Sequence, residues 1–150
     1  MTNDMSPFMQ KLIYVLAVSL WFGGLTFYAL VVVPAGTDVV GSTTQGFITQ
    51  GVTLRLNVVG AVSLACMLLS TVPARRKSLW IAWGLMAGAQ AALFVIHAQL
   101  AAMLESETRS VSDPANFYSL HRVYLLTTAG QWFACLWHLC ETIRLWQRKS

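Results

Sequence analysis

Residues 12–33 read LIYVLAVSLWFGGLTFYALVVV, and no side chain in this stretch is charged. At about 1.5 Å of rise per residue, a helix of this length crosses the roughly 30 Å hydrocarbon core of a bilayer. Backbone N–H and C=O groups in lipid must be paired within the segment, which favours a helix over any irregular chain. The stretch therefore predicts a transmembrane helix, and we expect it to end at Pro34 because proline interrupts a helix.

Three further apolar segments follow, at residues 56–72, 79–104 and 117–146. The first of them is close to the lower limit of about 17 residues for a membrane span. The whole chain of 150 residues is 56% hydrophobic and only 11% charged, whereas soluble domains carry about 25% charged residues. We therefore predict an all-α fold, a transmembrane four-helix bundle that forms one integral membrane domain over residues 1–150.

The basic residues predict how this bundle is oriented. Four spans place both chain termini and the short loop PARRKS on one side of the membrane, so the second and third spans form an antiparallel hairpin. That side carries most of the Lys and Arg residues, which mark the cytoplasmic side of a membrane protein. We expect an N-in/C-in, multi-pass protein of a bacterial-type inner (plasma) membrane. The basic residues of the inner side are Lys11, Arg75, Arg76, Lys77, Arg144, Arg148 and Lys149, against Arg55, Arg109 and Arg122 outside.

The two outer connections are predicted to be loops. Residues 35–54 are rich in Gly, Thr and Gln, a composition that allows at most a short interfacial helix. Residues 105–116 read as a solvated connector, with Asp113–Pro114 as a turn and Asn116 as the cap of the last helix. Basic residues sit at the ends of apolar runs without interleaved aromatics, so no nucleic-acid partner is predicted; the lipid bilayer is the expected surrounding.

A polar seam runs along the last apolar segment at alternating steps of three and four residues. Such a heptad seam keeps one helix face toward its neighbours, and polar groups in membrane helices face the bundle interior. A second seam follows Tyr14, Trp21 and Tyr28 in the first segment, while Gln90 and His97 share a face of the third. The seam of the last segment consists of His121, Tyr124, Thr128, Gln131, Cys135, His138 and Thr142.

The two outer histidines are the candidate metal or haem ligands. By helical rise His97 lies about 10 Å below the outer end of its segment and His121 about 6 Å below that of the last segment, so their depths are similar. Imidazole suits both iron and copper, so His97 and His121 predict axial ligands of haem b or part of a copper site. The alternative is interhelical hydrogen bonding, which contributes about 0.6–2 kcal/mol per contact.

Neighbouring polar residues complete the predicted cofactor-binding set. Tyr124 and Gln131 follow His121 on the seam, and Arg55 and Arg122 are basic residues at the same depth. The arginines either bind an anion, such as a haem propionate or a lipid phosphate, or extend to the headgroups. The C-x-x-H-x-C motif at 135–140 resembles a soft-metal cluster, but helical spacing turns its last cysteine away, so no three-ligand site is predicted there.

Two short motifs resemble a known family. WFGGL at 21–25, followed by Pro34, and FYSLHR at 117–122 are similar to segments of copper-resistance protein D-like membrane proteins and their small four-helix relatives. The resemblance implies a four-helix integral membrane protein linked to metal or haem handling. The first helix also resembles that of the bacterial membrane protoporphyrinogen oxidase, which carries a histidine there, whereas residues 12–33 contain none.

Three functions follow from these patterns. The protein either binds or transports a small ligand, metal or cofactor along its polar stripe, or serves as a structural subunit of a larger membrane complex or homo-oligomer, or is a haem-linked oxidoreductase. No nucleophile–base pair, phosphate loop or zinc-protease motif is present, so a hydrolase is not predicted. Small residues spaced by four, Gly84-x-x-x-Gly88-x-x-x-Ala92, predict a helix contact either within the bundle or between subunits.

Overall fold

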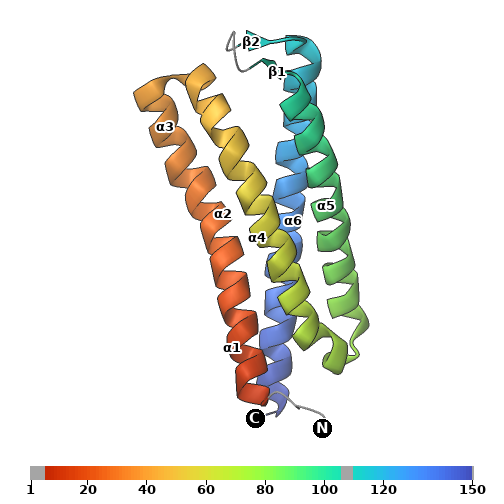
Figure 1. Ribbon diagram of the computed structural model, residues 1–150. Helices are drawn as coiled ribbons and strands as arrows, with labels where there is room; N and C mark the ends of the chain where they lie inside the picture. Colours follow the sequence, from red (N-terminus) through yellow and green to blue (C-terminus); the bar gives the residue numbers. More distant parts are fainter. Residues whose placement is uncertain (1–5, 106–109, 150) are drawn as a thin grey trace.

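The computed structural model describes residues 6–105 and 110–149 and consists of long helices joined by short turns (Figure 1). The first helix runs without interruption from Pro7 to Val40. It comprises α1 (Pro7–Val18), the wide π-helical turn η1 (Ser19–Gly23), α2 (Gly24–Phe27), a second wide turn η2 (Tyr28–Val32) and α3 (Val33–Val40). It is followed by α4 (Ser42–Ala74), α5 (Lys77–Ala102), the short strands β1 (Leu104–Glu105) and β2 (Ser110–Val111), and α6 (Pro114–Lys149).

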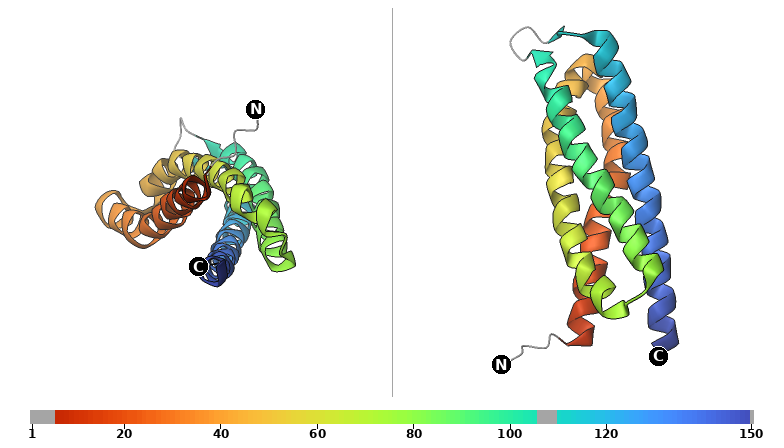
Figure 2. Two further views of the ribbon diagram at one scale, coloured as in Figure 1. Left: turned by 90° about the horizontal axis from the view of Figure 1, so that it is seen from below. Right: turned by 90° about the vertical axis from the view of Figure 1, so that its right-hand side faces the viewer.

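Three of these helices are long and apolar enough to cross a membrane: the first helix, α4 and α5. These helices indicate a membrane protein. The fourth helix, α6, has the length of a span but is not among the three, because the polar residues of its seam lower its hydropathy. The four helices nevertheless lie side by side: the first helix packs along α4, α4 along α5, and α5 along α6 (Figures 1 and 2).

The prediction that Pro34 ends the first helix is wrong. Proline lacks the N–H that would bond four residues back, and its ring clashes with the carbonyl there. The helix accommodates this by widening just before the proline, where the N–H of Val33 bonds to the carbonyl of Tyr28, five residues back. The chain reverses only at Gly41, whose φ of 78° lies in the region that favours glycine.

The predicted loop 35–54 is likewise helical and belongs to α3 and α4. Thr37, Thr49 and Thr53 each donate a hydroxyl hydrogen bond to a carbonyl of the preceding turn, so these polar side chains are satisfied within their own helices. Arg55 and Asn57 consequently lie well inside α4 instead of at its start.

The connection between α4 and α5 is tight. α4 ends at Ala74, and Arg75 adopts a left-handed conformation with φ of 50° before α5 begins, which gives the short hairpin loop that the sequence predicts. At the opposite end β1 and β2 form an antiparallel ladder. The predicted cap of the last helix is wrong by three residues, because the Asp113 carboxylate accepts the Asn116 N–H at 3.1 Å and Asp113 is therefore the cap.

Both chain termini lie at one end of the bundle together with the α4–α5 turn, and we call this the terminal end (Figure 1). The turn at Gly41 and the antiparallel β1–β2 ladder lie at the other end. We call this the hairpin end after the two strands; it is opposite the α4–α5 turn. α6 packs most extensively against α5. The first helix lies close to α6 at the terminal end and diverges from it toward the hairpin end (Figures 1 and 2).

The apolar core reflects this shape. In the terminal half it draws on all four helices, whereas toward the hairpin end a smaller cluster of Leu93, Leu100 and Tyr124 joins α5 to α6. The buried residues of the larger cluster are Tyr14, Val18, Trp21, Leu64, Met67, Met86, Ala134 and Cys135.

Candidate functional site

The polar seam of α6 faces the bundle interior over most of its length. Thr128 is half-buried, and His121, at the hairpin end of the seam, is exposed. The facing seam of the first helix is confirmed, since Tyr14, Trp21 and Tyr28 are all buried. The buried members of the α6 seam are Tyr124, Gln131, Cys135, His138 and Thr142.

In the terminal half, His138 connects three helices. Its Nδ1 lies 3.0 Å from the hydroxyl of Tyr14 on the first helix, and its Nε2 lies 2.9 Å from Oγ1 of Thr71 on α4. Thr71 donates its single hydroxyl hydrogen to the carbonyl of Met67 at 2.9 Å, so its oxygen must accept from Nε2–H. It follows that Nδ1 carries no hydrogen and accepts from Tyr14. This hydrogen-bond chain is complete, fully buried and structural in character.

In the middle of the bundle, two amides and a glycine bring the four helices together. Nε2 of Gln131 on α6 donates to Oε1 of Gln90 on α5 at 2.9 Å and to the carbonyl of Met86 at 3.2 Å. A Cβ at Gly60 of α4 would lie 2.5 Å from Oε1 of Gln90 and 2.6 Å from Nε1 of Trp21. Only a glycine at this position lets both side chains approach α4 so closely.

Toward the hairpin end the polar interior is incompletely hydrogen-bonded. Tyr124 donates its hydroxyl to Oδ1 of Asn57 at 3.2 Å. Within the described part of the chain, three buried side-chain atoms have no partner: the hydroxyl of Tyr28, Nδ2 of Asn57 and Nε2 of Gln90. Their residues are 8%, 5% and 4% exposed. A buried polar group without a partner costs about 1–3 kcal/mol, so three of them in one region require an explanation.

These three groups lie in one zone of the bundle, which we call the unpartnered layer. Asn57 is one helical turn from Gly60, where Gln90 contacts α4. Tyr28 lies on the same buried face of the first helix as Trp21, about 10 Å further toward the hairpin end. The layer presents two N–H donors and one hydroxyl, all neutral, to the interior.

The two predicted ligand histidines have different surroundings. His97 is half-buried, and its Nε2 donates to the carbonyl of Gln50 on α4 at 3.0 Å. His121 is exposed and stacks on the ring of Phe117 in its own helix, with ring centroids 6.1 Å apart. Among the described residues no group of three or more His, Cys, Asp and Glu side chains is arranged to hold a metal. Helical rise predicts similar depths for His97 and His121, but their side chains point to different neighbours.

The two predicted anion-binding arginines are on the surface. Arg55 is exposed and donates to the carbonyl of Gly51 one turn earlier in α4, at 3.3 Å. Arg122 is exposed on α6. Of the C-x-x-H-x-C motif, Cys135 is buried and Cys140 is exposed, so these two side chains face different surroundings.

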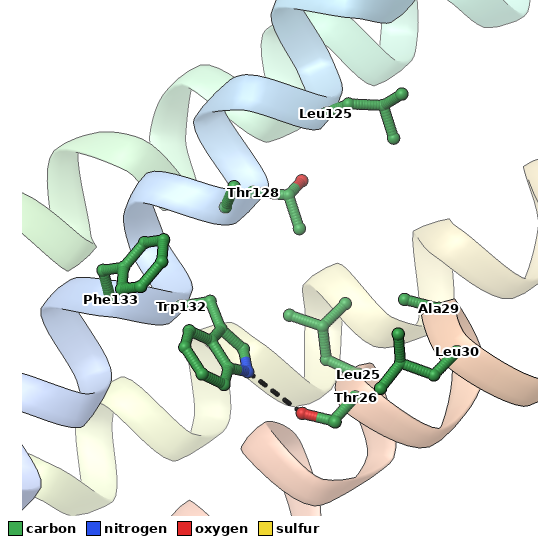
Figure 3. A pocket seen from close by; sticks show the side chains of 9 residues that line it. Leu25, Thr26, Ala29, Leu30, Leu125, Thr128, Trp132 and Phe133 are labelled. Carbon is green, nitrogen blue, oxygen red and sulfur yellow. Dashed lines mark hydrogen bonds between the residues drawn. The ribbon is translucent and has the colours of Figure 1, made fainter.

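A groove that the sequence does not predict lies between the first helix and α6 (Figure 3). Its volume is about 420 Å³. Trp132 donates its indole N–H to Thr26 across the groove at 3.0 Å and stacks on Phe22 with centroids 4.7 Å apart. The hydroxyls of Thr26 and Thr128 donate to carbonyls of their own helices, so the surface of the groove is almost wholly apolar. Its lining residues are Leu25, Thr26, Ala29, Leu30, Leu125, Thr128, Ala129, Trp132 and Phe133.

The helices and their buried polar layers define a helical membrane protein. No family model, curated protein or solved structure matches the chain. The resemblance of residues 21–25 and 117–122 to copper-resistance protein D-like proteins thus stays an expectation.

Proposed function

We propose that the chain is a four-span protein of a bacterial-type inner membrane that binds a small neutral ligand in the unpartnered layer. The fourth span is α6, which is about 54 Å long at 1.5 Å per residue. Its polar residues lower its hydropathy but face inward, whereas Leu126 and Phe133 on its outer face are 68% and 65% exposed. Between Val123 and Ile143 the exposed side chains of α6 are apolar, which supports a span.

An N-in/C-in orientation is supported by the charges of the terminal end. Arg75, Arg76 and Lys77 form the α4–α5 turn there. Glu141 of α6 binds Arg76 at 3.5 Å and Arg144 at 2.9 Å, which joins the last helix to the same basic region. Basic residues favour the cytoplasmic side, so the terminal end is assigned to the cytoplasm and the hairpin end to the outside.

The proposal of ligand binding is supported chiefly by the unpartnered atoms of Tyr28, Asn57 and Gln90. An oxygen acceptor placed between the two amides accepts a hydrogen bond from each of them and removes their desolvation cost. The tyrosine hydroxyl can donate or accept. Because these groups bind and orient but contain no nucleophile or general base, the proposed function is binding, with transport as its extension, and not catalysis.

Haem b or copper at His97 and His121 is the alternative ligand. His97 would have to release the carbonyl of Gln50 to offer Nε2, and His121 would have to leave its stack on Phe117. The residues as arranged therefore fit a neutral organic ligand better than a bis-histidine haem or copper site.

A subunit role in a homo-oligomer or a larger membrane complex stays open as a second function. Gly84 and Gly88 are exposed on α5, and a Cβ at either would meet nothing within 4 Å. The small-residue face thus points away from the bundle. Gly84→Leu is expected to weaken a self-association detected by chemical cross-linking, whereas Ala65→Leu, at an exposed position of α4, leaves it unchanged.

The decisive test is to purify the protein in lipid nanodiscs and analyse what accompanies it by mass spectrometry, visible absorption and metal analysis. Tyr28→Phe removes only the unpartnered hydroxyl, and Tyr118→Phe is the matched control on the surface, where Tyr118 is 66% exposed. We expect one organic molecule to accompany the wild type and Tyr118→Phe, and less of it to accompany Tyr28→Phe. A Soret band or bound copper that His97→Ala removes would replace this proposal with the haem or copper alternative. Equal content in both tyrosine variants would refute it.

A further inference from the structure

We propose that the groove between the first helix and α6 holds the alkyl or isoprenoid tail of a neutral, carbonyl-bearing lipid whose head reaches the unpartnered layer. This inference rests on the proposed function and names the class of ligand.

The groove opens toward lipid. Its rim residues Leu30, Leu125 and Phe133 are 72%, 53% and 65% exposed, so the surface around the opening is apolar. A molecule that enters from this side must be dissolved in the bilayer. The walls come from two helices joined across the groove by the Trp132–Thr26 hydrogen bond and otherwise offer only carbon to an occupant (Figure 3).

The groove lies directly beside the unpartnered layer. On the first helix Leu25 follows Trp21 by one turn and precedes Tyr28 by one turn, and it is half-buried between them. On α6 Thr128 follows Tyr124 by one turn and precedes Gln131 by one turn, and it is also half-buried. Leu25 and Thr128 therefore lie between the apolar groove and the polar interior, and a ligand that displaces the Leu25 side chain would contact both.

The positions of the charged side chains indicate which kind of head group fits the site. In the described part of the chain, no Lys, Arg, Asp or Glu lines the groove or belongs to the unpartnered layer. The arginines nearest in depth, Arg55 and Arg122, are exposed. An anionic phosphate buried there would have no cation to pair with, and burying an unpaired charge is costly. Two amide N–H groups and a phenol suit the oxygen of a neutral carbonyl compound instead.

The first helix is built in a way that suits such a site. Trp21 lies within the wide turn η1, and Tyr28 begins the wide turn η2, so both side chains that bound the layer on this helix lie in π-helical turns. Such turns are frequent at functional sites, because they redirect side chains without ending a helix. The two wide turns lie on either side of Leu25, and they are a second feature that supports a binding site in this region.

The test uses decylubiquinone, a neutral dicarbonyl with an alkyl tail, as the probe in detergent-purified protein. Saturable quenching of tryptophan fluorescence reports its binding, since Trp132 lines the groove. Ala129→Phe fills the groove and is expected to weaken binding about tenfold, the effect of excluding about two methylene groups. Ala65→Phe, exposed on α4, is the matched control and should bind as the wild type does. If Ala129→Phe does not fold, Ala29→Phe fills the groove from the opposite wall.

The outcomes separate the two proposals. Weaker binding in both Ala129→Phe and Tyr28→Phe supports a tail in the groove and a head in the layer. Weaker binding in Tyr28→Phe alone overturns the groove inference and keeps the proposed function. Unchanged binding in both variants overturns both proposals. Quenching of Trp132 by a brominated phosphatidylcholine that the quinone does not displace would show a bilayer phospholipid in the groove, and it would overturn the neutral-lipid assignment.

Discussion

Replacing Thr71 with valine tests the hydrogen-bond chain through His138. The substitution keeps the shape of the side chain but removes the oxygen that accepts from Nε2–H of His138. Both residues are 0% exposed, so water cannot replace the lost partner. Interhelical hydrogen bonds in membrane proteins contribute about 0.6 kcal/mol on average and up to about 1.7. A buried donor or acceptor left without a partner costs about 1–3 kcal/mol. We expect Thr71→Val to lower the free energy of unfolding by about 1–2 kcal/mol.

The direction of the hydrogen bonds through His138 makes a second measurement possible. Tyr14→Phe removes the hydrogen bond at the other ring nitrogen of His138, at 3.0 Å. Because both bonds depend on one tautomer of one imidazole, the two substitutions should not be additive, and we expect a coupling free energy of at least about 0.5 kcal/mol. Reversible unfolding in mixed detergent micelles, followed by circular dichroism, gives all four free energies of the double-mutant cycle.

The tautomer itself can be observed. With ¹⁵N-labelled histidine, His138 of the wild type should show hydrogen on Nε2 and none on Nδ1. In Thr71→Val the ring is expected to move its hydrogen to Nδ1 and donate to Tyr14 instead. Hydrogen on Nδ1 in the wild type, or additive free energies in the cycle, would refute the assignment of donors and acceptors.

Three further predictions concern other layers of the bundle. Tyr124→Phe removes the hydrogen bond that Oδ1 of Asn57 accepts and should lower the free energy of unfolding by about 1 kcal/mol in the same assay; a stabilised variant would contradict the 3.2 Å bond. Gly60→Ala inserts a Cβ 2.5 Å from Oε1 of Gln90 and should cost about 1–3 kcal/mol; an unchanged stability would show that the helices separate freely there. Glu141→Gln removes the charge that faces two arginines, so its thermal stability should fall below wild type at low salt and approach it at high salt; a salt-independent difference would contradict this.

The helices and their buried faces could be predicted because hydrophobic length and heptad spacing are local signals. Tyr14, Trp21 and Tyr28 share one face by spacing alone, and all three are buried. The extension of the first helix through Pro34 could not be predicted, because a single widened turn absorbs the proline and leaves no trace in composition. The helical start of α4 was hidden for a similar reason, since threonines that bond to their own backbone look like loop residues.

The candidate site was only partly visible in the sequence. Helical rise gave His97 and His121 similar depths, but rise fixes the position along the axis and not the direction around it. One ring therefore faces a carbonyl of α4 while the other stacks on its own helix. The groove depends on how far the first helix diverges from α6, which is a property of packing between segments distant in the chain. The unpartnered atoms of Asn57 and Gln90 depend on the same packing.

The wide turns η1 and η2 also bear on how this chain tolerates changes in length. Each π-helical turn is geometrically an α-helix that has taken up one additional residue without breaking. Deleting one residue within 29–32 should convert η2 into ordinary α-helix, while Tyr14 and Trp21 keep their places in the core. The first helix thus contains built-in sites for single-residue insertion and deletion. Variants that differ in length by one residue there should keep the same bundle and differ chiefly in the width of the opening beside α6.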